Sequence, residues 1–339
     1  MGARRLLAAD GGASKTDLVL LDADGQVLAA VRGPGSNPDN VGVDGCLAVL
    51  ERLVAEAATV AGDDLVEAPE VELGAFYLAG IDLPAQQRRL GALLGARGWS
   101  ARTVVDNDAF AVLRAGTPRA WGVAVVCGAG VNCVAVAPDG RRARYQAFGP
   151  VSGDWGGGLD VGLAALAAAV RGRDGRGPRT SLERSVPAHL GLPRPQAVAE
   201  AVHTGRLPQS VLTGLAPVVL ADARAGDEVA AAIVDRLGDE LAAMVTALIR
   251  RLRLARREVD VVLGGGLLQA GDARLLARVR AGVLASAGRA SLIQLTLPPV
   301  TGAALLALEA VGADQGVLEA ARQSVPAALA DALGGRADR

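Results

Sequence analysis

Acidic, hydroxyl and basic side chains gather near the start of the chain, in a short turn between two apolar runs. The first run ends at Asp10, and the second covers 18–21, after Gly11-Gly12-Ala13-Ser14-Lys15-Thr16-Asp17. Paired glycines let a backbone turn tightly and bring its N–H groups close to an anion. Asp10, at the end of a strand, is placed to hold a cation. We interpret this stretch as a phosphate-binding β-hairpin. Its predicted phosphate contacts are Gly11, Gly12, Ser14, Lys15 and Thr16.

The same order of features returns in the middle of the chain. An apolar run over 122–127 meets Gly128-Ala129-Gly130, and a second run covers 132–137. Neither turn has the spacing of a P-loop or of a dinucleotide-binding fingerprint. Either one alone is equally an ordinary glycine turn, but two in matching context favour phosphate binding. We expect a duplicated domain, with Gly128, Gly130 and Asn132 in the second hairpin.

Further polar residues follow predicted strands or lie in glycine-rich loops. Asp106-Asn107-Asp108 comes after the apolar strand 101–105, where Asp108 can cap the next helix or accept a proton from a hydroxyl. Asp154 lies among glycines, where it can cap a helix or bind hydroxyls. Asn37 can form a simple turn. Gly264-Gly265-Gly266 follows a buried strand, where it is either a plain loop or room for a flat ring.

Composition narrows the function classes. The net charge is −1, which favours neither nucleic acid nor a membrane surface, and Lys15 is the only lysine. Cys46, Cys127 and Cys133 are odd in number and lack CxxC spacing, so we expect no disulfide framework and no structural zinc. His189 and His203 have no carboxylate or cysteine at ligand spacing. With neither a leader pattern nor a membrane-length apolar run, we expect a soluble cytoplasmic protein.

Strands and helices alternate along the chain, which predicts an α/β fold with mixed sheets. The 339 residues suffice for two domains, and Gly116-Thr117-Pro118 is the predicted boundary. We assign 1–117 to the first domain, with the terminal helix 315–339 as a candidate addition. The second domain covers 118–314. It includes a helical insertion and a long amphipathic helix over 227–256.

These motifs resemble those of the acetate and sugar kinase, heat-shock protein and actin superfamily. The segments 10–16 and 127–133 look like its two phosphate motifs, and 261–266 looks like its adenosine motif. Within that superfamily the chain is similar to the BadF-type group that includes N-acetylglucosamine kinase. The pointers are Gly35-Ser36-Asn37, Asp106-Asn107-Asp108-Ala109, Asn132 and Gly153-Asp154.

The resemblance implies two ribonuclease H-like domains, an actin-like ATPase fold, with a cleft between them. ATP would bind both hairpins, with adenosine near Gly264, Gly265 and Gly266. Asp10 would hold Mg²⁺ through water. Asp108 would be the catalytic base. The implied sugar-binding residues are Asn37, Asn107, Asp108 and Asp154.

The resemblance also implies an ATP-dependent kinase that phosphorylates an amino sugar at its 6-hydroxyl. The favoured substrate is N-acetylglucosamine. The family tendency implies a homodimer. One alternative is an activator ATPase of 2-hydroxyacyl-CoA dehydratases, which needs cysteines that share an iron–sulfur cluster across a dimer. Another is a non-catalytic, sugar-responsive regulator. The family usually shows Gly-Asp-Glu-Gly-Ser where this chain has 153–157, so a glutamate is lost and Trp155 is gained. Trp155 can stack on a sugar or pack on its own loop.

Overall fold

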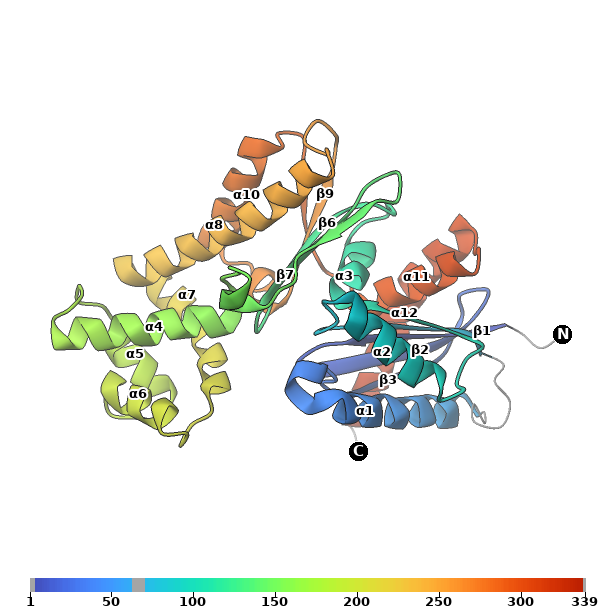
Figure 1. The fold of residues 1–339 in the computed structure, drawn as a ribbon, viewed down its shortest axis with the longest axis horizontal. Coiled ribbons are helices and arrows are strands. Elements are labelled where there is room, and N and C mark those ends of the chain that lie inside the picture. Colours follow the sequence, from blue (N-terminus) through green and yellow to red (C-terminus); the bar gives the residue numbers. More distant parts are fainter. Residues whose placement is uncertain (1–3, 63–70, 338–339) are drawn as a thin grey trace. The chain divides into compact units, whose positions relative to one another are not determined.

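The computed structural model describes residues 4–62 and 71–337. The chain forms two compact units, the first comprising 1–122 and 295–339 and the second 123–294. Within the described residues each unit contains one five-stranded sheet, and helices alternate with the strands along the chain (Figure 1). The predicted α/β class is therefore confirmed.

The first sheet has a central strand that is buried on both faces. Its strands are β1 (Arg5–Gly11), β2 (Lys15–Asp22), β3 (Val27–Pro34), β4 (Val71–Leu78) and β5 (Arg102–Asn107). They lie in the order β3-β2-β1-β4-β5, with β2 antiparallel to both neighbours and β4 and β5 parallel to β1. This is the arrangement of a ribonuclease H-like domain, as predicted.

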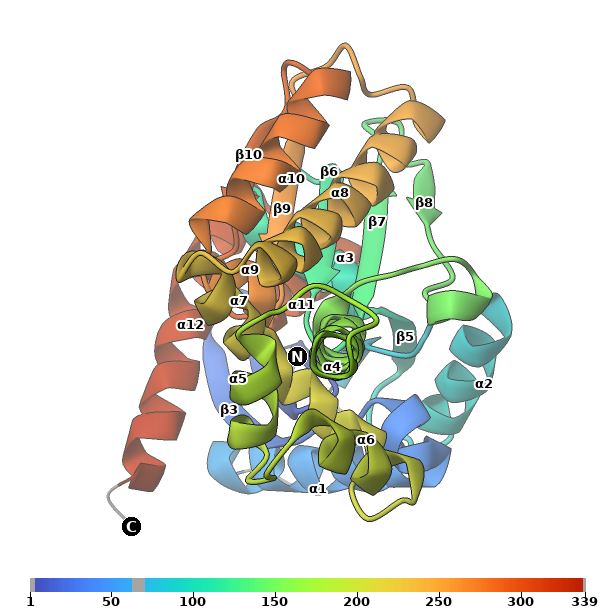
Figure 2. The same cartoon turned by 90° about the vertical axis from the view of Figure 1, so that its left-hand side faces the viewer.

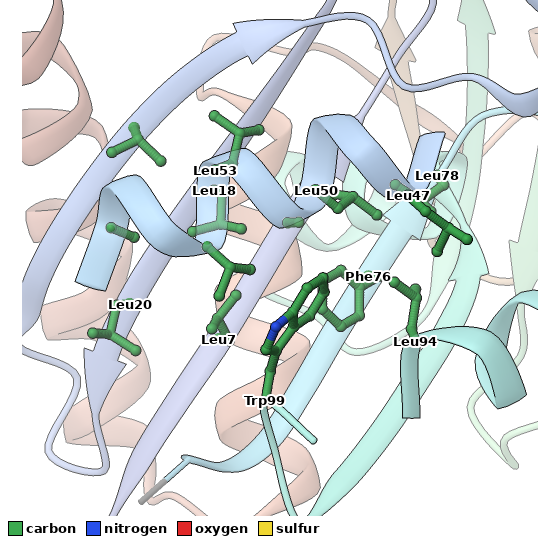
Figure 3. Close-up of a cluster of buried hydrophobic side chains, with 14 of the residues drawn as sticks. Leu7, Leu18, Leu20, Leu47, Leu50, Leu53, Phe76, Leu78, Leu94 and Trp99 are labelled. Carbon is green, nitrogen blue, oxygen red and sulfur yellow. The ribbon is translucent and has the colours of Figure 1, made fainter. Parts of the chain in front are cut away.

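Helices cover both faces of this sheet. They are α1 (Pro38–Ala61), α2 (Pro84–Gly95), α3 (Asp108–Gly116), α11 (Pro299–Ala310) and α12 (Gln315–Ala337). On one face, Leu7, Leu18 and Leu20 of the sheet pack with Leu50 of α1 and Phe76 of β4 (Figure 3). Because strands such as β1 are covered on both sides, their sequences are continuous apolar runs rather than alternating ones.

Residues 295–314 lie in the first unit, although they were predicted to belong to the second domain. Helix α11 packs against β1, β4 and α3. The reason is a close helix contact at Gly302, where an added Cβ would overlap the carbonyl oxygen of Ala111 and lie 2.7 Å from the amide nitrogen of Ala115. Arg322 of α12 also donates to the carbonyl oxygens of Ala115 and Thr117, at 2.8 Å each.

The second sheet repeats the first. Its strands are β6 (Gly122–Cys127), β7 (Val131–Val136), β8 (Arg142–Arg144), β9 (Asp260–Gly264) and β10 (Ser291–Gln294). The order is β10-β9-β6-β7-β8, with β9 parallel to both β6 and β10 and with β7 antiparallel to β8. Read from the other edge, this is the order of the first sheet. The repeat expected from the two glycine hairpins is therefore present in the topology.

The second unit carries most of the helices. The longer ones are α4 (Gly157–Asp174), α5 (Leu182–His189), α6 (Pro195–His203), α7 (Ala216–Arg224), α8 (Glu228–Arg251) and α10 (Ala273–Ser286). Short helices are η1 (Gly149–Val151), η2 (Gln209–Leu215) and α9 (Gly266–Gln269). Helices α8 and α10 lie side by side (Figure 2). Within the predicted helical insertion, the segment η2 is a 3₁₀ helix, and α7 follows it directly. Helix α8 ends at Arg251, before the predicted Arg256.

Candidate active site

The first hairpin closes tightly and leaves its tip open. Gly11 pairs with Thr16, and the Gly12 N–H donates to the carbonyl oxygen of Lys15 at 2.9 Å. Only glycine fits at position 11, because an added Cβ would overlap Ser36 Oγ and crowd the Leu78 side chain. Ser14 and Lys15 are exposed at the tip. The predicted phosphate contacts at the tip are therefore accessible to a ligand.

Thr16 lies inside the hairpin and braces it. Its side chain is fully buried, and its hydroxyl lies 2.8 Å from both the Pro34 carbonyl oxygen and Ser36 Oγ. The Ser36 N–H donates to the Gly12 carbonyl oxygen at 3.1 Å. The loop after β3 is thereby tied to the turn. Thr16 was predicted to contact phosphate, but its hydroxyl is engaged within the protein.

Two carboxylates face each other across the hairpin. Asp10 and Asp17 are direct partners in the β1–β2 register, so their side chains lie on one face. Asp17 is fully buried and accepts a hydrogen bond from Arg32 Nη2 at 2.8 Å, and Lys15 Nζ lies 3.8 Å from its Oδ2. Burial holds the pKa of the Asp10 carboxyl well above its usual range, and the charges of Asp108 and Asp17 raise it further. A divalent cation beside Asp10 would offset this repulsion, so a carboxylate at this position suits Mg²⁺ held through water.

Asp108 is the first residue of α3 and is partly exposed. Asn107 precedes it, fully buried, and its Oδ1 accepts the Ala109 N–H at 3.0 Å and so caps the helix. The Asn107 Nδ2 group donates to Asp82 Oδ1 at 2.9 Å. Burial raises the pKa of Asp108 to about 7, and the nearby Asp82 charge adds to the rise. At neutral pH such a carboxylate is a competent proton acceptor.

Asp82 is a further carboxylate beside Asn107 and Asp108 that was not among the residues predicted for the site. It lies in the loop between β4 and α2 and is largely buried. The available signal was its place after a buried strand, since a carboxylate there shares a sheet edge with the carboxylates after β1 and β5. Asn107 was predicted to bind sugar, but both ends of its side-chain amide are engaged within the protein.

Asn37 caps α1, its Oδ1 accepting the Asp39 N–H at 2.9 Å. Gly80, with φ +77°, lies beside it, and an added Cβ there would overlap Asn37 Oδ1. Because β1, β4 and β5 are parallel, their carboxyl ends meet at one edge of the first sheet. The topology therefore gathers Asp10, Asn37 and Asp108 at that edge.

The second hairpin supports the start of α4. The Gly128 N–H donates to the Gly130 carbonyl oxygen at 2.9 Å, and the Gly158 N–H of α4 donates to the Gly128 carbonyl oxygen at 2.8 Å. An added Cβ on Gly157 would lie 2.5 Å from Gly130 Cα. Asn132 Oδ1 accepts the next residue's N–H, that of Cys133, at 2.7 Å. A helix amino terminus attracts anions, so its place against this hairpin suits phosphate binding.

Gly264, Gly265 and Gly266 close β9 next to the second hairpin. At Gly265, where φ is +85°, an added Cβ would lie 2.7 Å from the Cys127 amide nitrogen. Strands β6 and β9 are neighbours, so this contact joins the ends of two parallel strands. The glycines predicted to bind adenosine therefore also pack the backbone of the second unit.

Asp154 and Trp155 lie in the loop before α4. The Asp154 carboxylate accepts the Ser152 hydroxyl at 2.5 Å. The Arg236 guanidinium, from α8, lies over the Trp155 ring, 4.0 Å from its centroid. One face of the Trp155 ring therefore makes a cation–π contact with α8, a partner that neither expectation for Trp155 named.

The cysteines do not form a reactive or metal-binding group. Cys46, Cys127 and Cys133 are all buried free thiols, and burial raises the pKa of Cys46 to about 11 and that of Cys127 to about 12. Among the described residues no three histidine, cysteine or acidic side chains are grouped to hold a metal. None of the described helices is long and apolar enough to cross a membrane.

Comparison with known proteins agrees with this geometry. Residues 9–307 match the model of the BadF/BadG/BcrA/BcrD ATPase family. The chain belongs to this family. The match spans both hairpins, the Asp108 region and the glycines after β9. The recognition made from the motifs is therefore confirmed, and ATP as the nucleotide follows from it.

Relatives of this family member are named as sugar kinases. An N-acetylmuramic acid/N-acetylglucosamine kinase of Clostridium acetobutylicum is 28% identical over 264 residues, 78% of this chain and 85% of that protein. An N-acetyl-D-glucosamine kinase of Dictyostelium discoideum is 28% identical over 313 residues, 88% and 96% respectively. A solved structure from Chromobacterium violaceum, provisionally named an N-acetylglucosamine kinase, has a TM-score of 0.72 and 26% identity. The match covers 90% of this chain and 99% of the chain in that structure.

Proposed function

We propose that this protein is an ATP-dependent kinase that phosphorylates an amino sugar, N-acetylglucosamine, at its 6-hydroxyl. The observation that carries the proposal is Asp108, a carboxylate with a raised pKa at the sheet edge that also holds the first hairpin. The names of the relatives supply the substrate class. The 6-hydroxyl oxygen attacks the γ-phosphorus and its proton passes to Asp108. The bond from the γ-phosphorus to the bridging oxygen breaks, which releases ADP.

The remaining roles follow from the chemistry of the residues. The exposed tip groups of the first hairpin and the second hairpin with α4 would bind the phosphates. Gly264 to Gly266 would lie along the adenosine. Asp10 would hold Mg²⁺ through water, and this ion would neutralise charge on the phosphates. Asn37 and Asp154 would bind sugar hydroxyls.

Two finer parts of the proposal concern location and assembly. We propose a cytoplasmic homodimer that acts on small molecules and contacts neither nucleic acid nor membrane. The net charge of −1 is consistent with such substrates. An iron–sulfur activator ATPase is disfavoured, since all three thiols are buried and none is presented for a cluster shared with a second subunit.

The test is an ADP-release screen with N-acetylglucosamine, N-acetylmuramic acid, glucosamine, N-acetylmannosamine and glucose, each at pH 8 with Mg²⁺. We expect the highest kcat/KM for N-acetylglucosamine and a 6-phosphate product by ³¹P NMR. The matched variant is Asp108→Asn, which keeps the side-chain shape and removes the base. It should lose at least about 100-fold in kcat while ATP affinity stays within twofold. No sugar-dependent ADP release from the wild-type protein would refute the proposal.

A further inference from the structure

Asp82 joins two segments that are far apart in the sequence. Its Oδ1 accepts the Asn107 Nδ2 group at 2.9 Å, and its own N–H donates to Gln86 Oε1 at 3.0 Å. Gln86 Oε1 also accepts the Leu83 N–H at 2.8 Å. The first turn of α2 thus fixes the loop that carries Asp82. The Asp82 carboxylate is therefore held in place rather than free to turn toward solvent.

Asn107 links the fixed position of Asp82 to the position of Asp108 through two hydrogen bonds of its side-chain amide. Because its amide nitrogen is bound to Asp82, its Oδ1 is turned toward the start of α3, where it accepts the Ala109 N–H. Asp108 lies between the capping residue and the capped N–H. A shift of Asn107 would therefore move the first turn of α3 and the Asp108 carboxylate with it. Displacing a catalytic group by about 1 Å can lower a rate about 100-fold.

The negative charge of Asp82 is a second feature, separate from its hydrogen bond to Asn107. An asparagine there would still offer Oδ1 to Asn107, with the same shape and no charge. The hydrogen bond to Asn107 by itself therefore does not require a carboxylate at this position. The acidic groups around Asp108 are Asp82 from the β4–α2 loop, Asp10 from β1 and Asp106 from β5. Burial is the largest cause of the raised Asp108 pKa, and the Asp82 charge adds to it. Asp108 also interacts with Asp10, whose pKa its charge raises. A base works best when its pKa lies near the operating pH.

We propose that Asp82 is a positioning residue for Asp108, acting through Asn107 and through its own negative charge. This inference rests on the proposed kinase function for its catalytic consequence. The Asp82–Asn107 contact and the Asp82 charge act whatever the substrate is. Asp82 does not need to touch the sugar or the nucleotide in this role.

Two variants separate position from charge. Asp82→Asn keeps the acceptor and removes the charge, so we expect kcat to fall roughly threefold with KM for the sugar unchanged. The acidic limb of the pH–kcat profile should move to lower pH. Asp82→Ala removes the acceptor as well, and we expect a loss in kcat of at least about tenfold. Asp24→Asn is the matched control. It also removes one negative charge, but from the turn between β2 and β3, at the end of the sheet away from Asp108.

A second measurement does not depend on activity. In a double-mutant cycle, the melting temperatures of wild type, Asp82→Asn, Asp108→Asn and the double variant are compared at pH 8 and pH 5. We expect the two substitutions to be coupled at pH 8. The coupling should shrink at pH 5, because Asp108 is then protonated in the folded protein.

The outcomes are distinguishable. A wild-type kcat and pH profile in Asp82→Asn, together with additive melting temperatures, would overturn the inference and leave the kinase proposal standing. Coupling at pH 8 in a protein that phosphorylates no sugar would support the Asp82–Asp108 interaction while refuting the kinase. An equal loss of kcat in Asp24→Asn would also overturn the inference, because the effect would then be one of net charge alone.

Discussion

Replacing Asp108 by asparagine should stabilise the folded protein at pH 8, where we expect the same substitution to lower kcat at least about 100-fold. The pKa of Asp108 is raised from 3.8 to about 7. At 1.36 kcal/mol per pH unit, keeping this carboxylate ionised costs roughly 4 kcal/mol above pH 7. Asp108 is partly exposed, so we reduce the figure for solvent screening to about 2 kcal/mol. For a unit of this size, that corresponds to a gain of about 4–8 °C in melting temperature.

The dependence on pH has a defined sign. The native pKa lies above the unfolded one, so the wild-type protein loses stability as pH rises from about 4 to 7 and levels off beyond. The asparagine does not titrate. Its advantage should therefore be full at pH 8 and roughly one third as large at pH 5. Removing the Asp108 charge also removes one cause of the raised Asp10 pKa, and this should further stabilise the variant at pH 8.

The assay is differential scanning calorimetry without nucleotide or Mg²⁺, following the transition of the first unit at pH 5, 6, 7 and 8. Asp44→Asn serves as the control, because Asp44 is an exposed carboxylate on α1. We expect this control to change the melting temperature by less than about 2 °C at every pH. An Asp108→Asn gain that is the same at pH 5 and pH 8, or a lower melting temperature at pH 8, would refute the electrostatic reasoning.

Three further predictions test other parts of the molecule. Asp10→Ala should weaken Mg²⁺-dependent ATP binding about tenfold or more by calorimetric titration and leave Mg²⁺-free binding within twofold; equal loss in both would contradict the metal role. Arg253→Gly should raise stability by about 1 kcal/mol in urea, because Arg253, one of two described non-glycine residues with positive φ, has φ +60° at the end of α8; a loss of stability would show that its side chain compensates the strain. Gly302→Ala should destabilise the first unit by about 1–3 kcal/mol or more, because the added Cβ overlaps the Ala111 carbonyl oxygen; an unchanged urea midpoint would show that α11 can move away from α3.

The order and type of most elements could be predicted from local patterns. Both hairpins are marked by an apolar run, a glycine turn and a returning run, and both are present in the two sheets. Proline at the first helical position, as at Pro84 of α2 and Pro195 of α6, is another local signal. Such signals are local, since a turn or a cap depends on a few neighbouring residues. The 3₁₀ segment 209–215 has apolar residues that resemble a helix pattern, and the sequence offered no local sign of the tighter turn.

The candidate site was predicted in part. Asp10 and Asp108 could be predicted because each lies at the end of a strand, and the strands are recognisable as apolar runs. Asp82 was not predicted, because its link to the site is a hydrogen bond to Asn107, a residue 25 positions later. Trp155 was left with two expectations, because its partner Arg236 lies on a helix about 80 residues away.

The amino-acid sequence by itself determined the class of fold, the pair of glycine hairpins and the carboxylates at strand ends, because periodicity and turn chemistry act over a few residues. Only the tertiary structure decided that 295–314 joins the first unit, since a glycine contact between α3 and α11 is invisible in either helix alone. The tertiary structure also decided the pKa of the Asp108 carboxyl. The pKa of a carboxyl depends on the water removed from it and on charges brought near it, and both follow from packing.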